Sequence, residues 1–251
     1  MYCRLFAVVL VGLMMMSVGR AADIVIANDD AWPPFSHADQ PGQGMANMLV
    51  IAAFQASGRE AEIRLLPWSR ALVSARLHKV DGVAAAFRTP EREEVYLYSD
   101  SFWEVRGVLL VQAQFPLVRY EYWDELKGFS IGVIQDNAAP LGFLEADLDF
   151  RSAPTRVSNL RKLAFGRVDM IYDVELPMFN TLDEIGLERS DFRVLEPPVG
   201  RNRLHLIVAK DHPEGAGIIQ AFNMGLQRIR ENGTYSNIAK RFQLPVVSPI
   251  D

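Results

Sequence analysis

The stretch Lys79-Val80-Asp81-Gly82-Val83 stands where an apolar helical pattern ends and a strand of small residues begins. A similar stretch, Gly166-Arg167-Val168-Asp169-Met170, stands at a second junction of the same kind. In both, a basic residue, Val and Asp join a helix to a strand. A three-residue match is weak by itself, but its repeated context predicts two α/β lobes of similar design.

The segments around the first junction alternate between strands and helices, and Gly58 fits the C-cap of the first helix. Strands are expected at 24–27, 63–65 and 82–87, and helices at 45–57 and 69–77. This order favours a parallel sheet covered by helices. Around the second junction, strands are expected at 129–134 and 168–172, with a helix at 157–165 between them and closing helices at 214–231 and 235–242.

Two extended apolar stretches, Val108–Val111 and Leu204–Ala209, flank the middle of the chain. We interpret them as crossings between the lobes. The first lobe then comprises residues 22–110 and 204–251, and the second comprises residues 111–203. A double connection is a natural hinge, and the cleft between hinged lobes is a natural site for a small molecule.

The first 21 residues have the pattern of a secretory signal peptide, with Arg4, an apolar run from Leu5 to Met16, and small residues Gly19 and Ala21 at the cleavage site. The run is shorter than the ~20 residues that cross a bilayer. We therefore expect a secreted protein released by cleavage. The only Cys, Cys3, leaves with the signal, so the mature chain has no Cys for metal binding or nucleophilic attack.

Composition narrows the class of function. Of the 251 residues, 49% are hydrophobic and 23% charged, which suits a globular core, and the formal net charge is −5. An acidic chain argues against non-specific nucleic-acid binding. The four His lack metal-ligand spacing, and GxSxG, P-loop and GxGxxG motifs are missing from the sequence. We expect a non-enzyme with no metal and no cofactor.

Arg92 is a candidate ligand-binding residue. Thr89 fits a helix N-cap and Pro90 the first helical position, so Arg92 falls in the first turn, where the helix dipole disfavours a cation. A guanidinium that grips a ligand carboxylate would explain that placement. The alternative is a surface ion pair with one of the nearby acids, which are Glu91, Glu94 and Glu104.

Two tryptophans lie in loops that follow strands. Trp32 stands beside Pro33 and Pro34, and Trp68 follows Pro67. Ligands of open parallel sheets lie beyond the carboxyl ends of strands, which is where both tryptophans and Arg92 are expected. Each tryptophan could wall a pocket or pack at the edge of a lobe.

Polar side chains follow two strands of the second lobe. Asp173, with Glu175 as a rival, could face the cleft and accept a hydrogen bond from an ammonium, or could cap the helix that follows. Asn137 could offer its amide or belong to a plain turn.

An ordered set of motifs resembles the family 3 periplasmic solute-binding proteins, the polar-amino-acid binders of ABC uptake systems. The matching stretches cover nearly all of the mature chain: Trp32–Phe35, Gly44, Lys79–Asp81, Thr89–Arg92, Tyr98–Asp100, Leu126–Gly128, Phe165–Asp169 and Asn232–Tyr235. The resemblance implies an α/β, two-lobed periplasmic binding protein-like fold of type II with a hinged central cleft.

The resemblance also implies roles for individual residues. Trp32 and Trp68 would sandwich the ligand side chain, Arg92 would hold the α-carboxylate and Asp173 the α-ammonium. Asp29 lies where some members contact a cationic side chain. Ala85, Ala86 and Phe87 lie where others offer Ser hydroxyls.

Four departures separate this chain from the family pattern. The loop before Thr89 is one residue short and Ala84–Ala86 supplies no hydroxyls. A Gly-Ser/Thr pair is replaced by Asp136-Asn137. Asp173 follows Asp169 one residue sooner than in amino-acid binders, so the choice between Asp173 and Glu175 stays open.

The resulting hypothesis is a monomeric periplasmic protein that captures a small polar ligand, an amino acid or a related carboxylate, by lobe closure. An inner-membrane ABC permease would receive the ligand. One alternative is an enzyme resembling periplasmic cyclohexadienyl dehydratases, with Glu175 as the acid. The other is a sensing module for a membrane partner.

Overall fold

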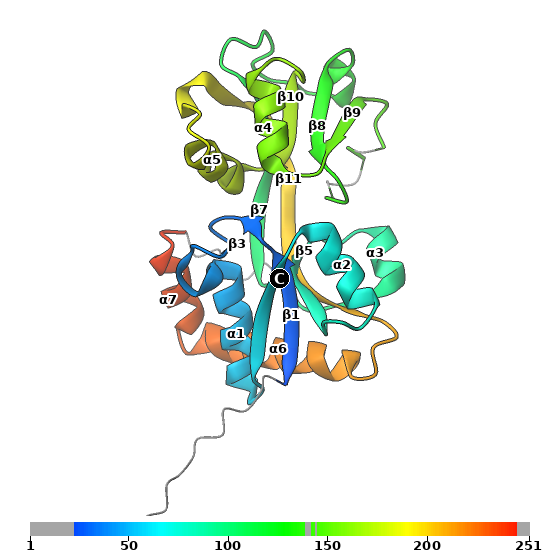
Figure 1. Ribbon diagram of the computed structural model, residues 1–251, viewed down its shortest axis with the longest axis vertical. Helices are drawn as coiled ribbons and strands as arrows, with labels where there is room; N and C mark the ends of the chain where they lie inside the picture. Colours follow the sequence, from blue (N-terminus) through cyan, green and yellow to red (C-terminus); the bar gives the residue numbers. More distant parts are fainter. Residues whose placement is uncertain (1–22, 139–141, 144, 245–251) are drawn as a thin grey trace, which may run out of the picture.

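In the computed structural model, which describes residues 23–138, 142–143 and 145–244, the chain forms two α/β lobes (Figure 1). The proposed signal peptide, residues 1–21, lies outside the described residues. Two long strands, β7 (Trp103–Gln112) and β11 (Phe192–Ala209), run from one lobe into the other. The two-lobed α/β fold expected from the sequence is confirmed.

The first lobe begins with the strand and helix order expected from the sequence. Strand β1 (Ile24–Asp29) pairs in parallel with β4 (Ala61–Leu66) and with β5 (Gly82–Ala86). Helix α1 (Met45–Ser57) ends at Gly58, whose φ of 86° lies in the left-handed region that glycine adopts easily. Helix α2 (Trp68–Arg76) connects β4 to β5.

The second lobe repeats this design. Strand β8 (Ser130–Ile134) pairs in parallel with β10 (Met170–Val174) and with β9 (Asp149–Ala153), and helix α4 (Arg156–Ala164) precedes β10. Strand β10 begins and ends two residues later than the sequence pattern predicted. Strand β9 was not expected at all, because its alternation is obscured by Asp149 and Arg151 on an exposed edge.

The two Val-Asp junctions have the same structure. Asp81 accepts a hydrogen bond from the backbone N–H of Val25 at 2.6 Å, and Asp169 accepts one from that of Ser130 at 2.7 Å. Each carboxylate therefore accepts a hydrogen bond from a backbone N–H at the start of the neighbouring parallel strand. The repeated motif thus marks equivalent positions in the two lobes.

The predicted crossings are parts of longer strands. Val108 to Val111 pair with β10 in the second lobe, whereas Ile207 to Ala209 pair with β6 (Tyr96–Tyr98) in the first. The two strands pass between the lobes where Gly107 faces Gly200, next to a break in register between Leu195 and Gly200. The strand order is β4-β1-β5-β11-β7-β10-β8-β9, which places β11 and β7 at the centre.

Helices cover both faces of the first lobe's sheet and bury its largest core. Helices α1 and α6 (Gly215–Glu231) pack closely, because a Cβ on Gly225 would lie 1.7 Å from the carbonyl oxygen of Ala53. Helix α7 (Thr234–Arg241) closes this layer. The remaining short elements are β2 (Ala31–Trp32), β3 (Ser36–His37), η1 (Pro41–Gln43), α3 (Pro90–Val95), η2 (Trp123–Leu126), α5 (Glu175–Glu184) and η3 (Arg189–Asp191).

Candidate functional site

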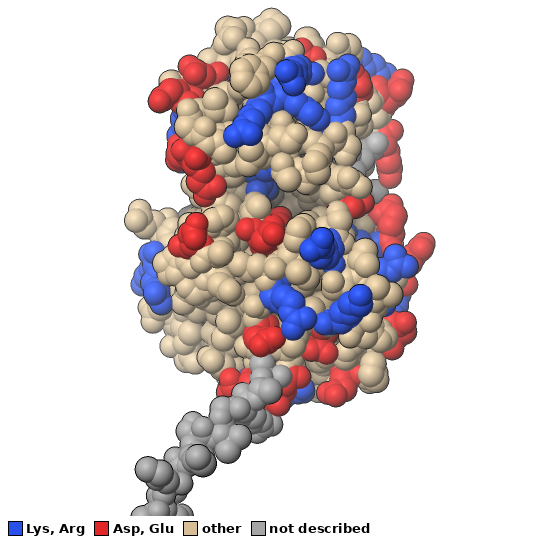
Figure 2. Space-filling model, in the orientation of Figure 1, with Lys and Arg blue, Asp and Glu red and all other residues tan. Residues whose placement is uncertain are grey.

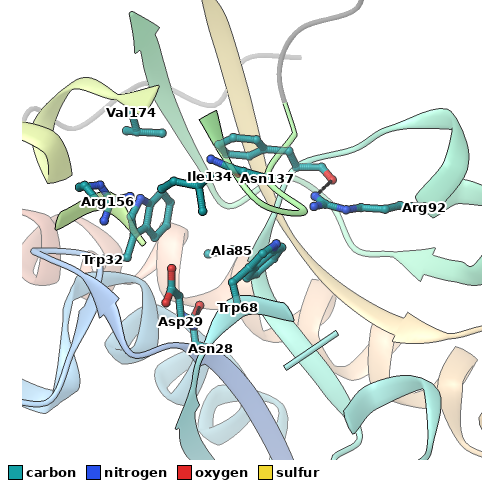
Figure 3. A pocket seen from close by; sticks show the side chains of 11 residues that line it. Asn28, Asp29, Trp32, Trp68, Ala85, Arg92, Ile134, Asn137, Arg156 and Val174 are labelled. Atoms are coloured by element: carbon teal, nitrogen blue, oxygen red, sulfur yellow. Dashed lines mark hydrogen bonds between the residues drawn. The ribbon is translucent and has the colours of Figure 1, made fainter. Parts of the chain in front are cut away.

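A cavity lies where the carboxyl ends of β1, β5, β8 and β10 meet the opposing lobe (Figure 3). Parallel strands of both lobes direct their carboxyl ends here, which is where ligands of open α/β sheets bind. Its lining comes from both lobes: Asn28, Asp29, Trp32, Trp68, Ala85, Phe87 and Arg92 from the first, and Ile134, Asn137, Arg156 and Val174 from the second.

The two tryptophans line the cavity. Trp32 is 7% exposed and packs on Phe35 with ring centroids 4.7 Å apart, so its position is fixed by the first lobe's core. Trp68 begins α2 and is half-buried. The two indoles thus offer aromatic surface to a ligand from two separate turns.

Arg92 lines the same cavity from the first turn of α3. Thr89 caps this helix by accepting a hydrogen bond from the backbone N–H of Arg92 at 3.3 Å. The guanidinium lies over the Trp68 ring, 5.1 Å from its centroid, and donates from Nη1 to the carbonyl oxygen of Phe87 at 3.1 Å. Burial lowers the pKa of Arg92. The surface ion-pair alternative is therefore set aside in favour of a cation held against an aromatic wall.

Asp136 joins the lobes directly. Its carbonyl oxygen accepts from Nη2 of Arg92 at 2.7 Å and from Nε1 of Trp68 at 3.1 Å. Its carboxylate accepts from the hydroxyl of Ser69 at 2.5 Å. The structure is therefore a closed arrangement in which first-lobe donors converge on one residue of the second lobe.

Arg156 is a site residue that sequence reasoning missed. It is 5% exposed, and its Nε and Nη2 donate to the carboxylate of Asp173 at 2.7 and 3.2 Å. Its Nη1 donates across the cleft to the carbonyl oxygen of Ala31 at 2.6 Å. Arg156 occupies the first turn of α4 behind the N-cap Thr155, the same local anomaly that singled out Arg92.

Asp173 lies outside the cavity and its neighbour Val174 lines it. Asp173 is 1% exposed, and its Oδ1 also accepts from the backbone N–H of Val174 at 2.7 Å. Successive side chains of a strand point to opposite faces, so the shift of one residue exchanges a carboxylate for an isopropyl group at the cavity.

Asp29 ends β1 and points into the cavity between Trp32 and Trp68 (Figure 3). Burial raises the pKa of its carboxyl group, whereas the nearby Arg156 charge and the backbone N–H of Ala31 act to lower it. An incoming cation would relieve this cost of burial, so Asp29 is poised to pair with one.

The remaining candidates divide between the cavity and the core. Phe87 and Asn137 line the cavity. Ala86 lies outside it, in the cluster with Ala71 and Ile207 beneath α2. Ala85 lines the cavity instead, and its φ of 60° is unusual for a residue with a side chain. This positive φ interrupts the alternation of faces along β5 directly before Ala86.

Glu175, the rival acid, begins α5 and faces the strands that join the lobes. Arg106 donates to it at 3.1 Å and to Glu196 at 2.7 Å. Glu175 is therefore part of an ion-pair network beside the crossing rather than of the cavity.

The surface charges, the metal-ligating side chains and the helices bear on other kinds of site. Figure 2 shows acidic and basic side chains interspersed over one face, which is hollowed where the lobes meet. Within the described part of the chain, no three His, Cys, Asp or Glu side chains gather as a metal site. Among residues 23–138, 142–143 and 145–244, no helix combines the length and apolar character that a membrane span needs.

Two lobes of matching design that close over a cavity lined by charged and aromatic side chains define a solute-binding protein. The chain belongs to the bacterial extracellular solute-binding proteins, family 3, because the model of that family matches residues 24–245. The family places the protein outside the cytoplasm and confirms the resemblance drawn from the sequence motifs.

Individual relatives are distant in sequence. The chain is 20% identical to the L-cystine-binding protein TcyA of Bacillus subtilis (strain 168) over 237 residues, 92% of this chain and 85% of that protein. A histidine kinase sensor domain with similarity to periplasmic binding proteins superposes with a TM-score of 0.76 at 21% identity, covering 88% of this chain and 95% of that one. The arginine-, lysine-, histidine-binding protein ArtJ from Geobacillus stearothermophilus gives a TM-score of 0.74 at 22% identity, covering 89% and 96%. These structural likenesses establish the fold.

Proposed function

We propose that this protein captures a small polar carboxylate, an amino acid or a close relative of one, by lobe closure in the periplasm and delivers it to an ABC-type uptake system. The observation that carries the proposal is the position of Arg92, a half-buried guanidinium that lines the cavity and lies over Trp68. A planar guanidinium with five donors suits bidentate recognition of a carboxylate.

Closure follows from where the lining residues come from. A ligand that contacts Arg92 and Trp68 on one side and Asn137 and Val174 on the other gains its full set of contacts only when the lobes are together. Ligand binding therefore favours the closed state by differential affinity. The amino-acid and cystine binders among the relatives support a ligand of this size and polarity.

The proposal is tested by calorimetry and thermal shift against a panel of amino acids and small carboxylates. A ligand that binds only the native state raises the melting temperature. Arg92→Ala should abolish the response to the best carboxylate. Arg88→Ala is the matched control, because Arg88 is exposed and pairs with Glu93 away from the cavity. Unchanged affinity in Arg92→Ala would refute this role of the guanidinium.

A second candidate function is sensing. The likeness to a histidine kinase sensor domain favours it, since the same two lobes can pass a ligand-loaded state to a membrane partner. Deletion of the gene separates the two. Loss of uptake of the bound solute supports transport, whereas intact uptake with loss of a solute-dependent transcriptional response supports sensing.

Periplasmic delivery rests on cleavage after Ala21, which follows the apolar run of residues 5–16. Mass spectrometry of the exported protein should give a chain that begins at Ala22. A full-length chain held in the membrane would contradict this part of the proposal.

A further inference from the structure

We propose that the ligand is an ω-amino carboxylate: a carboxylate and an ammonium at opposite ends of a short apolar chain, with no ammonium on the α-carbon. This inference rests on the proposed function, because it takes Arg92 as the partner of the carboxylate. It specifies which class of carboxylate fits the charges that the cavity presents.

The charged groups of the cavity lining are few. Among the described residues, they are the carboxylate of Asp29 and the guanidinium groups of Arg92 and Arg156. Arg156 is neutralised by Asp173, to which it donates twice while both side chains stay at least nine-tenths buried. One anion and one cation are left to meet a ligand, so the cavity matches a ligand with one charge of each sign.

In the described cavity lining, the second lobe has no carboxylate that could pair with an ammonium. Its other contributions are the side chains of Ile134, Asn137 and Val174, all of them neutral. Asp173 cannot serve in its place, because its Oδ1 accepts from Arg156 and from the backbone of Val174, and its Oδ2 accepts from Arg156 at 2.7 Å. An ammonium against Val174 would lose its hydration without gaining a partner.

The two charges that remain lie apart. Asp29 ends β1 and Arg92 lies in α3, and in Figure 3 the indole of Trp68 lies between them. The Arg92 guanidinium is itself 5.1 Å from the centroid of that ring. The α-ammonium and the carboxylate of an amino acid are both bonded to one carbon, so this pair of charges cannot reach both groups. A chain of several methylenes between the charges can. An amino acid with a cationic side chain can reach both, but its α-ammonium is then left without a partner.

The surfaces between the charges suit such a chain. Trp32 and Trp68 flank Asp29, so a cation there meets a carboxylate and aromatic faces together (Figure 3). Ala85 and Phe87 add apolar surface toward Arg92. The lining thus runs from an anion through apolar walls to a cation.

Matched probes test the inference. 6-Aminohexanoate and L-lysine differ only in the α-ammonium, and hexanoate lacks both ammonium groups. Calorimetry should give an affinity for 6-aminohexanoate about tenfold or more above that for L-lysine, since burial of an unpaired charged group costs at least the 1.4 kcal/mol that tenfold represents. Hexanoate should bind more weakly than 6-aminohexanoate, because Asp29 then lacks its partner. The pair 5-aminopentanoate and L-ornithine should show the same order.

Two variants locate the effect. Val174→Asp should bring L-lysine to parity with 6-aminohexanoate or beyond it, whereas Val174→Asn, of similar size but neutral, should leave the preference for 6-aminohexanoate in place. Asp29→Asn should weaken 6-aminohexanoate and leave hexanoate unchanged. Melting curves check that each variant is folded.

The outcomes separate this inference from the function on which it rests. If L-lysine or L-ornithine binds more tightly than its partner without the α-ammonium, or if hexanoate equals 6-aminohexanoate, the ω-amino assignment is wrong while carboxylate binding stands. If neither these probes nor the wider panel of carboxylates and amino acids binds, both proposals fall.

Discussion

Replacing Arg156 by Ala should destabilise the protein severely, for an electrostatic reason. The change strands the carboxylate of Asp173, 1% exposed, with only the backbone N–H of Val174 among its present donors within the described residues. Breaking a buried ion pair from one side costs about 3–5 kcal/mol. For a chain of this size, each kcal/mol corresponds to about 2–4 °C, so the melting temperature should fall by about 6–20 °C.

Urea unfolding followed by circular dichroism measures the loss, and two variants identify its cause. Arg161→Ala on the same helix removes an exposed guanidinium and should change the unfolding free energy by about 0.5 kcal/mol or less. Arg156→Met combined with Asp173→Asn removes both charges and should recover most of the stability, because neutral replacement of a buried pair is often harmless. A double variant as unstable as Arg156→Ala would refute the stranded-charge explanation and assign the loss to packing.

Three further predictions follow from other contacts. Asp29→Asn should raise the melting temperature at neutral pH, because burial raises the pKa of Asp29 and ionisation of this carboxyl group therefore costs stability. The gain should vanish as the pH falls below 3.8, the ordinary pKa of an Asp, because the carboxyl group is then protonated in both the folded and the unfolded chain. A gain that persists in acid would contradict a raised pKa of Asp29. Gly225→Ala should cost several kcal/mol or prevent folding, since its Cβ would collide with backbone of α1, whereas Gly217→Ala on the same helix meets nothing and should stabilise by about 0.5–1 kcal/mol. Trp68→Phe keeps an aromatic face but loses the hydrogen bond to Asp136, which is worth about 1 kcal/mol. The ratio of closed to open molecules of the ligand-free protein, measured by small-angle scattering, should therefore fall about fivefold. An unchanged scattering profile would argue against this contact.

The sequence was most informative where local chemistry and fold coincide. The Val-Asp junctions predicted two lobes because Asp81 and Asp169 perform one task, which is to accept a hydrogen bond from a backbone N–H at the start of a neighbouring strand. Helix α1 was predicted to the residue, since Gly58 supplies a left-handed C-cap that few other residues adopt easily. Such signals act within a few residues or across one strand pair, so periodicity and capping rules reach them.

Two of the predicted site residues, Ala86 and Asp173, lie next to a residue of the cavity lining rather than in it, and the physical reason is register. Asp173 and Val174 are adjacent, and only the strand's exact phase decides which faces the cavity. Ala85 and Ala86 differ in the same way, and the positive φ of Ala85 leaves no trace in a run of three alanines. Arg156 was missed for a different reason. The helix predicted at 157–165 begins one residue later than α4, so Arg156 fell before its first turn, where the rule that singled out Arg92 does not reach.

The two arginines also explain how recognition can be coupled to closure. Each lies in the first turn of a Thr-capped helix of one lobe and donates to a carbonyl oxygen of the other: Arg92 to Asp136 at 2.7 Å, and Arg156 to Ala31 at 2.6 Å. Arg92 uses Nη1 and Nη2 for its described main-chain partners, and a guanidinium has five N–H groups. A ligand carboxylate can therefore bind the same side chain without displacing Asp136. The hydrogen bond to Asp136 and the bond to the ligand carboxylate then hold the Arg92 guanidinium in the same orientation, so each bond lowers the entropic cost of forming the other. Ligand affinity should therefore fall whenever the contact between Arg92 and Asp136 is weakened.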